Sequence, residues 1–411
     1  MPLSPYASLR IPDFRRLLLA NGTLTVAREA QIVVVGWQVF ELTRDPLTLG
    51  LIGLAEALPY IAVALYAGHV ADRTERRTLG IAGTFGVILS AIALLLLTLS
   101  PGAIRANRVW PVYVVIALSA TARSFMRPAV FALSVAVVPR ELYPNAVAWR
   151  TSIWHVAAVA GPATGGLLYG FRGPAAAYLA VIVAMAFSLA AMIAVTHRAR
   201  PEPPAEEVPL GESLSSGIRF VWNEPMLLYA MTLDLFAVLF GGAVALLPAF
   251  ATLLNAGPEG LGLLRAAPAA GSILMGLLIA HRPPMRRAGR SLFLSVSGFG
   301  VCMILFALSR HFWISFAVLF ASGVFDNVSV VIRSTLLQTR TPEHLLGRVS
   351  AVNQIFIGSS NEIGAFESGV AARLMGVVPS VLFGGCMTLL VVAMVAWRAP
   401  RLRGMREITE S

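Results

Sequence analysis

The chain has 411 residues, of which 57% are hydrophobic and only 13% are charged. A soluble domain carries roughly twice that share of charged residues, so the composition indicates a membrane protein. The formal net charge of +11 invites a nucleic-acid-binding interpretation, but the basic residues, all arginine, are spread over many short polar segments, which argues against such a surface.

Apolar runs of about twenty residues, the length that crosses a bilayer as a helix, recur along almost the whole chain. The twelve candidate spans lie at residues 17–42, 46–67, 78–99, 110–137, 145–170, 174–196, 226–254, 261–280, 291–308, 312–337, 349–374 and 377–397. The sequence therefore predicts an all-α membrane protein with twelve transmembrane helices.

The longest polar interruption divides these spans into six and six. It predicts an N-terminal half over residues 1–197, a linker over 198–224 and a C-terminal half over 225–411. The prolines of residues 201–204 favour an extended chain. Residues 214–222 then read as a short amphipathic helix along the inner membrane surface, whose apolar side carries Leu214, Ile218, Val221 and Trp222.

The distribution of arginine predicts the orientation in the membrane. About twenty arginines lie in the N-terminal segment, the even-numbered connections and the C-terminal tail, and about six lie in the odd-numbered connections. We therefore expect both termini to be cytoplasmic, in the inner membrane of the cell. Two cysteines and six scattered histidines show no ligand spacing, so neither a metal site nor a cofactor is expected.

Residues 68–77 are predicted to form a short charged loop between the second and third spans. Its glycine, acid and basic cluster resemble the loop signature of the major facilitator superfamily, and the matching positions are Gly68, Asp72, Arg73, Arg76 and Arg77. The resemblance implies a cytoplasmic gate, in which Asp72 accepts hydrogen bonds from a helix N-terminus or pairs with an arginine. The alternative is an ordinary turn with topogenic charge. Residues 281–290 occupy the equivalent position in the second half and keep only the basic cluster.

The fifth span contains small residues at helical spacing beside a proline, at Gly161, Pro162, Gly165 and Gly166. Small residues let helices approach closely. The pattern resembles the glycine-proline signature of proton-coupled antiporters in the superfamily, and generic tight packing is the alternative.

Three longer stretches, at residues 123–147, 235–268 and 341–369, are similar to the enterobactin-exporter-like branch of the superfamily, also called transmembrane secretion effectors. This resemblance covers nearly the whole chain and implies two six-helix halves around a central cavity. One departure is Ala365, where that branch more often has an acid.

Ionisable residues within the spans are the candidate functional groups, because a charge in the bilayer costs about 2.5–3.5 kcal/mol on insertion scales unless it faces a partner or a cavity. We expect proton coupling at one of Glu29, Asp234 and Asp326. The candidate substrate and cavity residues are Arg28, Glu56, Arg123, Arg127, Arg333, Asn361, Glu362 and Glu367. For each acid, a structural ion pair is the alternative. Arg28 and Glu29, as neighbours on a helix, are expected to face different walls.

The sequence thus favours a secondary transporter, a monomer, that exports a small organic molecule by proton antiport and alternating access. The arginines within the spans favour an anionic substrate. An importer or lipid flippase of the same fold and a non-transporting membrane sensor are the alternatives. No motif of an enzyme or of an ATP-driven pump is present in the sequence.

Overall fold

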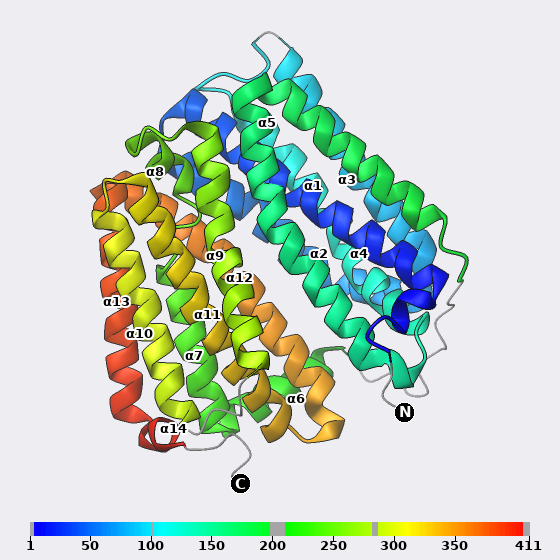
Figure 1. Ribbon diagram of the computed structural model, residues 1–411, viewed down its shortest axis with the longest axis vertical. Helices are drawn as coiled ribbons and strands as arrows, with labels where there is room; N and C mark the ends of the chain where they lie inside the picture. Colours follow the sequence, from blue (N-terminus) through cyan, green and yellow to red (C-terminus); the bar gives the residue numbers. More distant parts are fainter. Residues whose placement is uncertain (1–3, 101, 198–209, 282–286, 406–411) are drawn as a thin grey trace. The chain divides into compact units, whose positions relative to one another are not determined.

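The computed structural model describes residues 4–100, 102–197, 210–281 and 287–405. Within these ranges the regular secondary structure is helical, apart from one isolated bridge between Arg105 and Arg108 (Figure 1). The α-helices are α1 (Pro12–Thr43), α2 (Pro46–Arg73), α3 (Arg76–Leu99), α4 (Trp110–Ala136), α5 (Tyr143–Ile193), α6 (Leu210–Asn223), α7 (Pro225–Phe240), α8 (Leu247–Leu253), α9 (Gly257–Ala280), α10 (Ala288–Leu308), α11 (Phe312–Arg340), α12 (Glu343–Met375), α13 (Val377–Arg398) and α14 (Pro400–Gly404).

Each of the twelve predicted spans is helical over most of its length. In the described part of the chain, eight helices are long and apolar enough to cross a membrane, or nine if the bent pair α6 and α7 counts as one. The eight cover nine predicted spans, because α5 contains two of them joined at Gly173, whose φ of 79° interrupts the helix. Helices α1, α7 and α12 lie at the other three.

Two expectations about helix boundaries are wrong. The predicted ten-residue loop at residues 68–77 is only a two-residue turn, Thr74 and Glu75, because α2 continues to Arg73 and α3 begins at Arg76. A helix can keep its backbone hydrogen bonds after it leaves the apolar layer, so charge alone does not end it. The predicted span at 226–254 is interrupted between α7 and α8, where Gly241 ends α7.

The chain forms two compact units, and two helices contribute to both. Unit 1 comprises Met1–Arg44, Ala55–Ala205 and Gly257–Ala266. Unit 2 comprises Asp45–Leu54, Glu206–Ala256 and Ala267–Ser411. The first residues of α2 therefore belong to unit 2, and the first residues of α9 belong to unit 1. The functional division at 1–197, 198–224 and 225–411 stays a prediction, and residues 198–209 of the linker lie outside the described residues.

In unit 1, α1 packs along α5, and α3 packs against both α4 and α5. Small side chains of α1, including Ala27 and Ala30, meet Val87 and Ala91 of α3 in a buried cluster. In unit 2, α10 packs against α11 and α13, and α7 packs against α12 and α13. These close contacts bring the charged residues of different spans together.

Helix α6 includes the predicted residues 214–222, and the placement of its apolar side along the inner membrane surface stays a prediction. Val221 is buried in a cluster with residues of α7 and α12, whereas Ile218 and Trp222 are 50% and 72% exposed. Gly217, one turn before Val221, packs against the backbone of Arg348, where an added Cβ would lie 3.0 Å from the carbonyl oxygen. The side chain of Leu214 lies outside the described residues.

Candidate functional site

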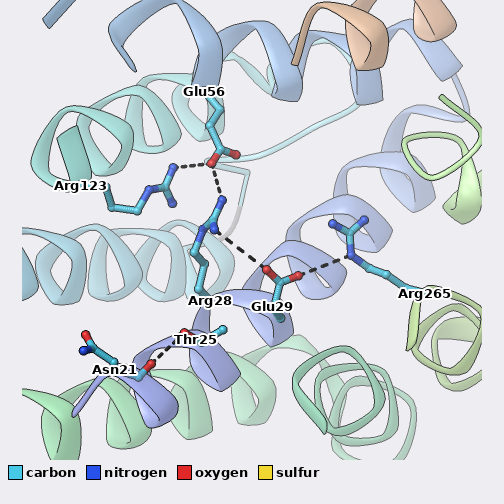
Figure 2. Close-up of polar contacts among 7 residues, drawn as sticks. All are labelled: Asn21, Thr25, Arg28, Glu29, Glu56, Arg123 and Arg265. Atoms are coloured by element: carbon cyan, nitrogen blue, oxygen red, sulfur yellow. Dashed lines mark hydrogen bonds and ion pairs between the residues drawn. The ribbon is translucent and has the colours of Figure 1, made fainter. Parts of the chain in front are cut away.

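The charged residues of unit 1 meet around the carboxylate of Glu56 on α2 (Figure 2). Its Oε1 accepts a hydrogen bond from Arg28 Nη2 on α1 at 2.9 Å and another from Arg123 Nη2 on α4 at 2.6 Å. The side chains of Glu56 and Arg123 are 17% and 14% exposed. Charge-assisted bonds of this kind hold ionised groups in an apolar protein interior. One carboxylate therefore ties three helices together.

Glu29, one residue after Arg28 on α1, lies between two guanidinium groups and is bound tightly by neither. Its Oε1 is 4.0 Å from Arg28 Nη1, and its Oε2 is 4.0 Å from Arg265 Nε on α9. Arg28 bonds to Glu56 on α2 and Glu29 lies beside Arg265 on α9, as expected for helix neighbours that face different walls. Both 4.0 Å separations exceed hydrogen-bond length. Glu29 and Arg265 thus form a loose ion pair across α1 and α9.

Arg127 lies one helical turn beyond Arg123 on α4. Its guanidinium carbon is 6.0 Å from the centre of the Tyr60 ring, one turn beyond Glu56 on α2. This separation is the outer limit of a cation–π contact. Helices α2 and α4 therefore present two successive polar contacts to each other, Glu56 with Arg123 and Tyr60 with Arg127.

The glycines of the antiporter-like motif let α5 approach α1 and α9. A Cβ on Gly165 would lie 2.7 Å from Ala30 Cα on α1, and a Cβ on Gly161 would lie 2.6 Å from the Cβ of Glu29. On the other side of α5, a Cβ on Gly166 would lie 2.9 Å from Gly262 Cα on α9. Pro162 belongs to the same crossing, because its carbonyl oxygen would lie 2.4 Å from a Cβ on Gly262. The motif thus places the helix backbones that carry Glu29 and Arg265 close to one another.

Unit 2 contains a second charged cluster on α7 and α11. Asp234 Oδ2 pairs with Arg333 Nη1, and both side chains are 10% exposed. Arg333 Nε donates a hydrogen bond of 3.2 Å to Ser329 Oγ on its own helix. Asp326, two turns before Arg333, is close enough to interact electrostatically with Arg333 and Asp234. Among the described residues, however, its carboxylate has neither a hydrogen bond nor an ion pair within 4.0 Å.

For the three candidates on α12, the structure describes contacts within their own helix and at its crossing with α2. Asn361 Nδ2 donates to Ile357 O on its own helix at 2.8 Å. Glu362 lies where α12 crosses the first residues of α2, at Gly53. At this crossing a Cβ on Gly53 would lie 2.8 Å from the Cβ of Ala365, so the position where an acid was expected is a packing position here. Glu367, the third, lies near Ser368 on the same helix.

The predicted gate residues are divided between the end of α2 and the start of α3. Gly68 and Arg73 belong to α2, and the side chain of Asp72 lies outside the described residues. Arg76 begins α3, and Arg77 Nη2 donates a hydrogen bond of 2.7 Å to Ile193 O at the end of α5. A cation there satisfies a free carbonyl and complements the helix dipole. The gate function of the motif stays a prediction.

Two charged residues that make polar contacts between helices or helix ends were not among the candidates from the sequence, Arg265 and Asp13. Arg265 is an arginine inside an apolar run, which is the same signal that identifies the other candidates, and it lies near the start of the span predicted at residues 261–280. Asp13 on α1 accepts hydrogen bonds from Thr196 N at 3.0 Å, Thr196 Oγ1 at 2.8 Å and His197 N at 2.8 Å. Burial of the Asp13 carboxyl opposes its ionisation, but these hydrogen bonds and Arg16 outweigh that effect and lower its pKa.

In the part of the chain that the structure describes, no group of three or more His, Cys, Asp or Glu side chains is placed to hold a metal ion. The two free cysteines, Cys302 and Cys386, do not form a disulfide. The polar chemistry of both clusters is therefore that of carboxylates and guanidinium groups.

Comparison with known proteins gives matches over nearly the whole chain. A family model described as "Transmembrane secretion effector" matches residues 3–410. The chain is 26% identical over 399 residues to the enterobactin exporter EntS of Shigella flexneri, covering 96% of this chain and 94% of that protein. It is 25% identical over 386 residues to YfiS of Bacillus subtilis strain 168, described as an uncharacterized MFS-type transporter, covering 88% of this chain and 86% of YfiS.

Solved structures of transporters share the fold at low sequence identity. The nucleoside transporter NupG superposes with a TM-score of 0.71 at 10% identity and covers 94% of this chain and 99% of NupG. A bacterial homologue of the human lysosomal transporter Spinster, in an inward-facing and unoccupied conformation, superposes with a TM-score of 0.69 at 14% identity and covers 95% of each chain. These likenesses establish the fold and leave the transported molecule open.

Proposed function

The chain belongs to the transmembrane secretion effector family of major facilitator transporters, and we propose that it exports a small organic molecule from the cytoplasm in exchange for protons. In this proposal two six-helix halves expose a cavity to each side of the membrane in turn, and the termini are cytoplasmic. The motif at Gly68, Asp72 and Arg73 acts as the cytoplasmic gate.

The observation that carries proton coupling is the state of Asp326. A proton carrier must be an acid that can both gain and lose a proton within the membrane, and a carboxylate fixed by several hydrogen bonds resists protonation. Asp234 and Glu56 have such partners. Asp326, within the described residues, has none, although its charge interacts with Arg333 and Asp234. This arrangement favours Asp326 over Asp234, and also over Glu29, whose carboxylate lies 4.0 Å from each of two guanidinium groups.

Sharing of Arg333 supplies a physical route from protonation to movement. When Asp326 is protonated, Arg333 is left to Asp234. When Asp326 is ionised, it competes with Asp234 for the guanidinium of Arg333. The attraction between α7 and α11 then differs from that in the protonated state. A proton on Asp326 thus biases one arrangement of the two helices, which is what coupling requires.

The charged cluster of unit 1 supports two different roles. Glu56 with Arg28 and Arg123 fixes α1, α2 and α4 relative to one another through short hydrogen bonds. Glu29 and Arg265 are held loosely and are available to a bound molecule. We assign cargo contact to this loose pair and structural support to the tight network.

The direction of transport is proposed from the relatives, since EntS of Shigella flexneri is named an exporter and aligns over 96% of this chain. The predicted excess of arginine on one side supports cytoplasmic termini, and the bacterial relatives support the inner membrane as its location. We propose a monomer as the working unit.

Comparative metabolite profiling tests export and reveals the cargo together. Cells that lack the protein are compared with the same cells carrying the wild type, the Asp326→Asn variant or the Asp45→Asn variant. We expect at least one small organic compound to accumulate inside the cells that lack the protein and those that carry Asp326→Asn. Asp45, a half-exposed acid paired with Arg373, serves as the matched control that restores export. Accumulation of no compound contradicts export.

A further inference from the structure

Among the described charged residues of unit 1, Arg265 stands out because its guanidinium has a single, long polar contact. It lies in the ninth position of α9, which begins at Gly257, and its side chain is 22% exposed. Its one polar contact among the described residues is the 4.0 Å approach of Nε to Glu29, and none of its N–H groups makes a hydrogen bond there. A guanidinium carries five donors, and leaving them without acceptors inside a membrane is costly.

The orientation of Arg265 leaves its two terminal nitrogens available. Figure 2 shows that Nε faces Glu29, whereas the terminal amino groups point away from it. Two parallel N–H groups at the end of a guanidinium match the two oxygens of a carboxylate in a bidentate pair. The geometry therefore suits a planar oxyanion bound at these two nitrogens, with Glu29 on the Nε side of the same guanidinium.

Among the described residues, Glu29 lacks hydrogen-bond donors in the same way that Arg265 lacks acceptors. Its two oxygens lie 4.0 Å from Arg28 Nη1 and from Arg265 Nε, and neither accepts a hydrogen bond among the described residues. A partly buried carboxylate needs donors. A molecule that satisfies both residues must bring an acceptor for Arg265 and a donor for Glu29.

The close packing of α5 fixes the distance between these two groups. Gly161 allows α5 to contact α1 at Glu29, and Gly166 allows it to contact α9 at Gly262, one turn before Arg265. The helix backbones on both sides are therefore held by glycine contacts that larger residues would disrupt. A pair of charges on a rigid backbone is suited to select for ligand geometry.

We propose that Glu29 and Arg265 form a recognition site for organic acids that carry a hydroxyl or ammonium group next to the carboxylate. The carboxylate binds the terminal nitrogens of Arg265, and the neighbouring donor binds Glu29. This inference rests on the proposed transport of a small organic molecule and adds the chemical class of its head group.

Mandelate is a suitable probe, because it is a small amphipathic acid with a hydroxyl next to the carboxylate. Phenylacetate lacks the hydroxyl and mandelamide lacks the acid, so the three compounds separate the two contacts. Equilibrium binding to the purified full-length protein in detergent needs neither a membrane nor a pH gradient. A failure of proton-driven export in cells or vesicles would therefore leave this binding pattern intact. Loss of the binding pattern would likewise leave proton-driven export of another compound untouched.

For the wild type, we expect mandelate to bind about tenfold more tightly than phenylacetate, and phenylacetate more tightly than mandelamide. The Arg265→Gln variant should bind mandelate as weakly as mandelamide. The Glu29→Met variant should bind mandelate as weakly as phenylacetate while keeping its preference for the acid over the amide. Arg373→Gln, which removes an exposed arginine elsewhere, should bind like the wild type.

If Arg265→Gln does not yield folded protein, Arg265→Lys decides the question, because it keeps the charge and removes the planar fork. It should lose most of the preference for mandelate over mandelamide. Absence of saturable mandelate binding to the wild type, equal affinity for acid and amide, or an unchanged preference in the Arg265 variants would each overturn the proposal.

Discussion

The carboxylate of Asp234 on α7 forms a buried ion pair with the guanidinium of Arg333 on α11. Asp326, on the same helix as Arg333, acts on this pair electrostatically without being held by it. Two acids and one arginine on two helices therefore constitute the part of unit 2 in which a single proton changes the balance of charge.

This sharing predicts unequal effects of removing either partner. Arg333→Gln leaves two carboxylates near each other, so we expect the full loss for breaking a buried pair, about 3–5 kcal/mol in the free energy of unfolding. Asp234→Asn should cost less, because Arg333 can then turn to Asp326. The measurement is unfolding of the purified variants in one detergent. Equal losses for the two variants would contradict the shared arrangement, and the double variant Asp234→Asn with Arg333→Gln should recover stability relative to Arg333→Gln alone.

Glu56 should be more important to stability than an exposed acid of the same kind. Glu56→Gln weakens two short hydrogen bonds from Arg28 and Arg123 at once and leaves two guanidinium groups facing an amide. We expect a loss of about 3 kcal/mol or more, compared with about 0–1 kcal/mol for Asp45→Asn, whose partner Arg373 is 58% exposed at 3.2 Å. Thermal unfolding of both variants in detergent measures the difference in stability. Similar melting temperatures for the two variants would contradict the structural role of Glu56.

The close crossing of α5 and α9 predicts opposite results for two glycine substitutions. A methyl group on Gly166 would lie 2.4 Å from Pro258 O, so Gly166→Ala should destabilise the protein by about 1–3 kcal/mol. Gly68 lies inside α2 with no described atom within 4 Å of an added Cβ, so Gly68→Ala should stabilise the helix by about 0.5–1 kcal/mol. Comparison of the two unfolding temperatures is the measurement. A tolerated Gly166→Ala would mean that the crossing is looser than described.

Asp13 predicts a pH dependence at the end of α1. Because hydrogen bonds from Thr196, His197 and Arg16 outweigh burial and lower the pKa of Asp13, the ionised carboxylate stabilises the fold. That stabilisation is fully present above the ordinary pKa of 3.8 and is lost as the pH falls below it through the lowered value. Asp13→Asn should therefore be less stable than the wild type at pH 7, and the difference should shrink below the ordinary pKa. A difference in stability that stays constant with pH would contradict this role.

Hydropathy was sufficient to predict where the long helices of the described chain lie, because a bilayer leaves the backbone few choices other than a helix of sufficient length. Hydropathy did not predict where helices end outside the apolar layer. The continuation of α2 to Arg73 and the short turn before α3 were therefore not predicted. The interruption after α7 depends on Gly241, where a Cβ would lie 2.5 Å from the Phe299 ring of another helix. Such a contact is not visible in a single segment.

The candidate site was predictable in its members and not in its pairings. An arginine or acid within an apolar run can be recognised from the sequence as a candidate functional residue, as was the case for Arg28, Glu56 and Arg123. The pairing of each guanidinium with a carboxylate depends on how separate helices approach one another. The spacing of residues within one helix does not determine this pairing. The loose pair of Glu29 with Arg265 depends on glycine crossings between three helices, and it became visible only when α1, α5 and α9 were placed together.

The central claim is that a proton on Asp326 drives export, and proton release from inverted membrane vesicles tests it most directly. Vesicles are acidified inside by respiration, the exported compound is added outside, and loss of the internal acidity is followed with a pH-sensitive dye. We expect the compound to release protons through the wild type and the Asp45→Asn control, and we expect Asp326→Asn to abolish this release while still binding the compound. Proton release by Asp326→Asn at the wild-type rate would contradict the account.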